Sequence, residues 1–288
     1  MAGASPTIRQ RELGLRLRTL RTSLGLTVED VAEKLLCSTA KISRMETAAR
    51  RPVLRDVRDL CALYEVDEAV AAELMRLTRE AREQGWWTQY DDLGLSPYIG
   101  LEQDATSITA FSMQYVHGLA QTEDYARTII KAIAPKIDPA IHQQRVEARL
   151  RRQELLEQTN PPRYRLLLDE AVLHRPVGGP VRGPALMAAQ IQKVLDLAAS
   201  DRATVQIIPF ETGAYAVADI GFTLLEFNET FLLPVVFVEG LAGSQYYERA
   251  VDVARYRESI EYVRDSALSP RDSIQRLTDT RTIYVAGS

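Results

Sequence analysis

Cysteine, histidine and long apolar runs are scarce in this chain, and each scarcity excludes a class of protein. The 288 residues include only two cysteines and three histidines. Cys37 and Cys61 both lie in the N-terminal part and match no metal-binding spacing, so no disulfide framework and no metal site is predicted. No apolar run approaches a membrane span, and the N-terminus has no hydrophobic signal region. We therefore expect a cytoplasmic protein that makes no membrane contact.

Charge is divided unevenly along the chain. Residues 1–58 hold 12 Lys and Arg against 6 Asp and Glu, a net of +6. The remaining residues hold 23 basic against 33 acidic side chains, a net of −10. A basic module joined to an acidic body is the distribution expected of a nucleic-acid reader with a separate control domain. The length of the chain also allows two domains.

The stretch from Leu26 to Pro52 predicts two short helices joined by a three-residue turn, followed by an arginine-rich loop. Thr27 is placed to cap the first helix, with Asp30 at the capping-box position. Ser38 is placed to cap the second helix. This spacing is typical of a helix-turn-helix, whose second helix enters the DNA major groove.

The second helix carries a charge that packing alone does not explain. Lys41 lies in its first turn, where the helix dipole favours an acid, and a cation costs about 0.3 kcal/mol or more unless phosphates are close. Ile42 and Met45 are expected to point inward. Arg44 lies on the outward face, and Arg50 and Arg51 follow in the loop. We therefore predict a DNA-binding surface here.

The segments GLTVEDVAEKL and STAKISRMETAARRP resemble the helix-turn-helix of the phage-repressor and Cro-like (XRE-type) family. The resemblance implies that the helix end at Thr27 touches phosphate and that Arg21 pairs with Glu46. One departure is Ala48, where the family usually has glycine. The local sequence pattern and the family resemblance together predict the following DNA-binding residues: Thr27, Ser38, Thr39, Ala40, Lys41, Ser43, Arg44, Arg50 and Arg51.

The rest of the pattern predicts an all-α five-helix domain over 1–84, a linker over 85–100, and an α+β domain over 101–288. The second domain is expected to contain a small mixed sheet covered by helices. Its expected helices are 102–115, 122–134, 139–158, 184–199, 248–267 and 270–280, with a loop at 177–184. Its expected strands are 164–168, 204–209, 222–227 and 235–239, the last two forming an antiparallel pair.

A series of motifs in this half resembles the C-terminal domain of actinobacterial helix-turn-helix regulators of the WhiJ-like group. They are WW, HGLAQTEDYAR, RRQELL, PPRYRLLLDEAVLHRPVGG, VQIIPF, FTLLEF and VVFVEGLAGSQYYE. Departures are His117 and Ala120, in a turn expected to read PGLLQ. The resemblance implies transcription control by a domain that receives a signal, commonly from a small protein encoded nearby. It implies no catalytic residues.

The chemistry of the second half gives little support for an enzyme. Its three histidines lie in different predicted elements. Asp169, Glu170, Glu226 and Glu239 are candidates to gather at strand ends, but no metal spacing or nucleophile elbow links them. Structural hydrogen bonding is the better explanation. We therefore predict no enzyme, no cofactor and no metal.

The sequence thus predicts a homodimeric, nucleoid-associated regulator that binds a palindromic operator in double-stranded DNA and responds to a small protein or small-molecule effector. Two apolar stripes could form the dimer contact or only cover the sheet: Leu150, Leu155 and Leu156, and Val251, Tyr256, Ile260 and Val263. The alternatives are a hydrolase or transferase with a DNA-binding module, and an antitoxin-like protein that sequesters a small partner.

Overall fold

The computed structural model describes residues 8–50, 53–82, 85–93, 96–217, 219–228, 233–240 and 243–287. The chain forms two compact units, the first ending at Asp104 and the second beginning at Ala105. None of the helices in these ranges is both long enough and apolar enough for a bilayer crossing.

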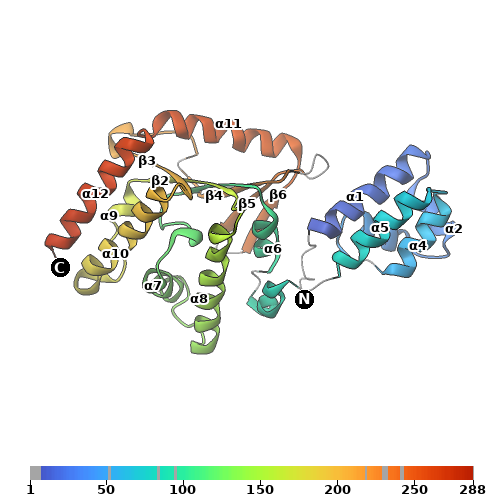
Figure 1. The fold of residues 1–288 in the computed structure, drawn as a ribbon, viewed down its shortest axis with the longest axis horizontal. Helices are drawn as coiled ribbons and strands as arrows, with labels where there is room; N and C mark the ends of the chain where they lie inside the picture. Colours follow the sequence, from blue (N-terminus) through green and yellow to red (C-terminus); the bar gives the residue numbers. More distant parts are fainter. Residues whose placement is uncertain are drawn as a thin grey trace. The chain divides into compact units, whose positions relative to one another are not determined.

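The first unit has the predicted five helices (Figure 1): α1 (Ile8–Ser23), α2 (Val28–Lys34), α3 (Thr39–Glu46), α4 (Leu54–Leu63) and α5 (Glu68–Glu80). Each helix places its apolar stripe in one shared core, which is centred on Leu17, Val31, Ile42, Leu60 and Leu77. Leu24 continues the helical spacing of Leu13 and Leu17 but lies just beyond α1 and is half exposed. Helices α2 and α3 therefore rest on a core of their own.

The segment predicted as a linker, 85–100, is folded. It forms the 3₁₀ segment η1 (Trp86–Leu93) and most of α6 (Ser96–Asp104), which pack on each other and group with the first unit. The two tryptophan rings meet edge to face, with centroids 6.1 Å apart. The boundary between the units therefore falls after Asp104, later than the sequence suggested.

The second unit is built on a six-stranded mixed sheet of order β3-β2-β1-β4-β5-β6. Strands β1, β2 and β3 run parallel to one another, and β4, β5 and β6 continue the sheet in antiparallel pairs. The strands are β1 (Ser107–Ser112), β2 (Arg163–Asp169), β3 (Ala203–Ile208), β4 (Phe222–Glu226), β5 (Val235–Gly240) and β6 (Gly243–Tyr247). The predicted α+β architecture and the antiparallel β4–β5 pair are confirmed.

Helices cover both faces of this sheet (Figure 1). Helix α11 (Ala250–Ser266) lies over one face, and α7 (Glu123–Ile133), α8 (Pro139–Gln153) and α10 (Gly179–Ala199) lie on the other. Helix α12 (Pro270–Ala286) packs against α10 and β3. The short elements are η2 (Gly118–Ala120), η3 (Glu154–Glu157), α9 (Ala171–His174) and η4 (Phe210–Thr212).

The outer edge of β3 is closed by the chain between α11 and α12. The Leu268 N–H donates to the Ile207 carbonyl at 2.8 Å, and the Ile207 N–H donates to the Ser273 hydroxyl at 3.0 Å. An edge strand with satisfied polar groups does not offer a template for another chain. The backbone of Ile207 on this edge is therefore already paired within the subunit.

Two sequence predictions in this unit are wrong, and one strand was missed. The helix expected at 102–115 is helical only to Asp104, the end of α6, and then becomes strand β1, because Ile108, Ala110 and Phe111 are buried in the middle of the sheet and tertiary pairing overrides local preference. The loop expected at 177–184 is the start of α10, which begins after the left-handed Gly178 and contains Pro184. Strand β6 was not predicted.

The two apolar stripes considered for a dimer contact serve the subunit's own core. Leu155 and Leu156 are buried, as are Ile260 and Val263. Of the second stripe, Val251 alone is exposed, at 48 %. Ile260, Val263 and Tyr256 of the second stripe pack on the sheet, and Leu155 and Leu156 of the first are buried within the same subunit.

Candidate nucleic-acid interface

Helix α2 begins at a complete capping box. The Thr27 hydroxyl accepts from the Asp30 N–H at 3.1 Å, and the Asp30 carboxylate accepts from the Thr27 N–H at 2.7 Å. The hydrogen bond from the Thr27 hydroxyl to the carboxylate lowers the pKa of Asp30. Thr27 is exposed. A phosphate can therefore approach this helix end, although the N–H and the hydroxyl of Thr27 already donate to Asp30.

The turn between α2 and α3 is a Schellman motif with leucine in the glycine position. Leu36 has φ of 51° and is 95 % exposed. The Cys37 N–H reaches back to the Ala32 carbonyl at 2.9 Å, which satisfies the end of α2. Ser38 then caps α3 by accepting from the Lys41 N–H at 3.2 Å. Caps on both helices thus set the direction in which α3 leaves the turn.

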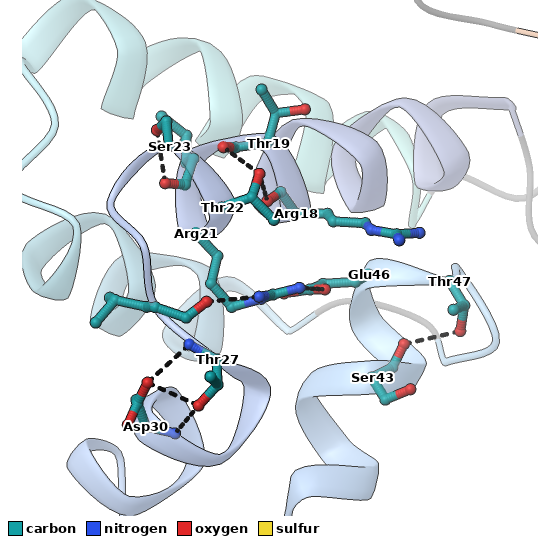
Figure 2. Close-up of polar contacts among 12 residues, drawn as sticks. Arg18, Thr19, Arg21, Thr22, Ser23, Thr27, Asp30, Ser43, Glu46 and Thr47 are labelled. Atoms are coloured by element: carbon teal, nitrogen blue, oxygen red, sulfur yellow. Dashed lines mark hydrogen bonds and ion pairs between the residues drawn. The ribbon is translucent and has the colours of Figure 1, made fainter.

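Helix α3 divides into a buried and an exposed face. Ile42 and Met45 are 1 % and 4 % exposed and enter the core. The side chains that remain open to solvent are the predicted base-facing set: Thr39, Ala40, Ser43 and Arg44. Thr47, which was not predicted, lies beside Ser43 and donates to its carbonyl at 2.8 Å (Figure 2). The structure therefore brings the predicted set onto one open face.

Arg21 and Glu46 form the expected pair (Figure 2). Arg21 Nε donates to Glu46 Oε1 at 2.6 Å, and Nη2 donates to Oε2 at 2.9 Å. The third nitrogen, Nη1, donates to the Leu26 carbonyl at 2.7 Å, so one guanidinium joins α1, the α1–α2 connection and α3. The two side chains are 10 % and 6 % exposed. This hydrogen-bonded carboxylate raises the pKa of Arg21.

Tyr64 is a buried neighbour of this pair. Burial, followed by the charge of Glu46, raises the pKa of Tyr64 to about 12. Its hydroxyl has no hydrogen-bond partner among the described atoms. The phenol therefore stays neutral and, from the C-terminal end of α4, contributes apolar packing to the core of the first unit.

Two contacts that hold α3 were missed by sequence reasoning. A β-carbon on Gly14 would lie 2.7 Å from the carbonyl oxygens of Met45 and Glu46, so only glycine lets α1 approach α3 this closely. Lys41 Nζ lies 2.7 Å from Asp56 Oδ1, with side chains 25 % and 14 % exposed. The glycine inside a helical pattern was the available signal for the first contact. Nothing in the sequence marked Asp56.

The loop after α3 is described only in part. The Arg50 side chain is exposed. The backbone N–H of Arg50 donates to the Arg44 carbonyl at 3.0 Å. Ala48 occupies the left-handed region with φ of 56°, so alanine makes the turn for which the resembling family uses glycine. Its carbonyl accepts from Gln10 Nε2 at 2.9 Å. Arg51 lies outside the described residues.

The polar groups at the strand ends of the second unit are engaged in hydrogen bonds. Glu170 accepts from the Phe210 N–H at 2.8 Å, from Arg276 at 2.5 Å and contacts His174 at 3.3 Å. Burial raises the pKa of Glu170, but the Phe210 N–H and Arg276 outweigh it and leave the pKa lowered. Asp169 accepts from the Tyr215 hydroxyl and the Ala171 N–H. These contacts are structural.

The remaining candidates do not converge with them. His117 bonds to the Tyr164 hydroxyl and His142 to the Arg127 carbonyl, each at 2.9 Å. Glu226 pairs with Arg257 on α11. No group of three or more His, Cys, Asp or Glu side chains suited to a metal occurs in the parts of the chain that the structure describes.

Comparison with known families separates the same two regions. A family model described as a helix-turn-helix domain matches residues 12–74. A second model, described as a domain of unknown function (DUF5753), matches residues 95–279, which is more than half of the chain. No curated protein and no solved structure matches.

Proposed function

Because this chain belongs to the DUF5753 family and carries a helix-turn-helix domain ahead of that region, we propose that it is a sequence-specific DNA-binding transcriptional regulator. The observation that carries the proposal is the open face of α3, which is small and polar apart from one arginine. That face is held in place by caps, a close glycine contact and a buried ion pair. Helices presented in this way are suited to the major groove.

Contacts to the DNA bases and contacts to the phosphates are assigned to different side chains. Arg44 can donate two hydrogen bonds to a guanine edge, while Thr39 and Ser43 contact neighbouring bases and Ala40 leaves room for them. Thr27, Ser38, Lys41, Arg50 and Arg51 are assigned to the phosphates, whose neutralisation is independent of sequence. Support comes from the exposure of Thr27, Ser38 and Arg50 and from the basic charge of residues 1–58.

The active form is proposed to be a homodimer on a palindromic operator. One reading helix covers a half-site, and high affinity requires two helices about one helical turn of DNA apart. Since the two apolar stripes examined above are used internally, the dimer contact is assigned to another surface of the second unit. That unit is proposed to receive a small-molecule effector or a small protein, and no catalytic step is assigned to it. The proposed location is the cytoplasm, on the nucleoid.

Selection of binding sites from random duplex DNA tests this proposal. The full chain is expected to enrich one palindromic sequence. Arg44→Ala is expected to enrich a degenerate sequence or none, while Arg79→Ala, which removes an exposed arginine from α5, is expected to behave as the wild type. Failure of the wild-type chain to enrich any sequence would contradict the proposal.

A further inference from the structure

A cleft opens on the α11 face of the six-stranded sheet, where β1, β2 and β3 begin. Its volume is about 390 Å³, and its lining includes Ser107, Thr109, Arg163, Arg165 and Thr204. A second hollow of about 280 Å³ continues toward α11 and shares Thr109, Arg165 and Glu226 with the first. Both volumes together are of the size that small-molecule sites occupy in proteins.

The side chains on this face of the sheet change from apolar to polar along β1 and β2 toward the cleft. On β1, Phe111 is followed toward the cleft by Thr109, and on β2, Leu167 is followed by Arg165. The register places Arg165 opposite Thr109 on one side and opposite Thr204 on the other. Residues in register point to the same face, so one guanidinium is flanked by two threonines.

Arg165 has no carboxylate partner at this position. It forms no ion pair among the described residues, and its Nε is buried without a hydrogen-bond partner. Burial and then the charge of Arg264 lower the pKa of Arg165, and the charges of Glu261 and Glu226 offset this only in part. An arginine that is half buried and unpaired is unfavourable unless an anion completes its surroundings.

The acids near the cleft do not supply that anion. Glu226 is bonded to Arg257, and Glu261 is bonded to Arg264, so each of these charges is already matched. Asp201 lines the first hollow and Glu258 the second, but both are exposed to solvent, and Glu258 accepts from the Tyr262 hydroxyl. Arg163, two residues from Arg165 on the same strand face, also forms no ion pair among the residues described. Two unmatched guanidiniums therefore line one cavity.

We propose that this cleft binds a small anion, with Arg165 and Arg163 holding a carboxylate or phosphate group and Thr109 and Thr204 donating to its oxygens. Arginine is suited to this role because its planar fork donates parallel hydrogen bonds to both groups. The inference that the cleft binds an anion does not depend on whether the protein binds DNA. Use of the anion as a signal rests on the regulatory function proposed above.

The test is the thermal unfolding of the full chain in rising concentrations of inorganic phosphate and, separately, of succinate, with chloride holding ionic strength constant. A ligand that binds the folded state raises the midpoint temperature in a saturable manner. At least one of the two anions is expected to do so, and which one identifies the group. Arg165→Met is expected to weaken the response about tenfold or more, whereas Arg271→Met, which removes an exposed arginine at the start of α12, is expected to retain it.

Two results would overturn the inference. One is the absence of a saturable shift with either anion in the wild type, and the other is an Arg165→Met response equal to that of Arg271→Met. If Arg165→Met does not fold, Arg163→Met and Thr109→Val replace it under the same criterion. An anion response in a chain that enriches no DNA sequence would contradict the proposed function and leave this inference intact.

Discussion

Lys41 in the first turn of α3 and Asp56 in the first turn of α4 form an ion pair, with Nζ and Oδ1 2.7 Å apart. From sequence alone, a cation at this position appeared to need phosphate for compensation. The structure supplies a carboxylate from the next helix. The proposed phosphate contact of Lys41 would therefore compete with Asp56, which reduces the charge that α3 presents in the absence of DNA.

Asp56→Asn is expected to strengthen DNA binding and to weaken the fold slightly. Releasing Lys41 and removing one negative charge should increase affinity for operator and random DNA alike and steepen the salt dependence by about one counterion. The stability loss should be about 1 kcal/mol, because both side chains are partly exposed. Asp59→Asn makes the same charge change elsewhere on α4 and is the control. Equal affinities for the two variants would refute this prediction.

Glu46→Ala is expected to destabilise the first unit by about 3–5 kcal/mol, because it leaves the Arg21 guanidinium buried without its partner. Both tryptophans lie in η1 of the same unit, so fluorescence during urea unfolding of the full chain reports on it. Glu33→Ala removes an exposed acid from α2 and should have little effect. A loss below about 1 kcal/mol for Glu46→Ala would show that the pair behaves as a surface pair.

The helix-turn-helix was largely predictable because its signals are local. Thr27 and Ser38 mark helix starts within three residues of the groups they cap, and Ile42 and Met45 show helical spacing. What sequence could not show were contacts between distant segments. Gly14 fits under the carbonyls of α3, and Asp56 reaches back to Lys41, so both depend on the assembled fold.

The second unit was less predictable because its sheet is formed by distant segments. Strand β1 pairs with β2, more than fifty residues later, and with β4 beyond it, and burial on both faces removes the alternation that identifies a strand. The anion-binding cleft was missed for the same reason. Arg165 was read as part of a strand, and only the register places Thr109 and Thr204 on either side of it.

Glu170→Gln is expected to destabilise the second unit near neutral pH and to lose this effect in acid. The folded pKa of Glu170 lies below its usual value of about 4.3, so the carboxylate's contribution is complete above that pH and disappears as pH falls through the folded pKa. Unfolding of both proteins by circular dichroism across this range measures the difference. Glu211→Gln is the control, since Glu211 also faces Arg276 but its side chain is 72 % exposed. A difference that does not depend on pH would contradict the assignment.

The full chain is expected to be a dimer in solution, and a fragment ending at Asp104 is expected to be a monomer. The fragment contains a complete core of its own and one reading helix, so it should bind the operator much more weakly than the full chain. Sedimentation analysis of both gives the masses, and titration against operator DNA gives the affinities. A dimeric fragment, or a monomeric full chain that still binds the operator tightly, would overturn the assignment of dimerisation to the second unit.

We propose that the open face of α3 reads base sequence while the loop that follows it supplies affinity. The measurement that tests it most directly is the binding of Arg44→Ala, Arg50→Ala and Arg51→Ala to operator and random DNA across a salt series. Arg44→Ala is expected to reduce discrimination by about 1–3 kcal/mol. The loop variants should weaken both DNAs equally and reduce the salt slope by about one each. Equal weakening of both DNAs by Arg44→Ala, with an unchanged ratio between them, would contradict the account.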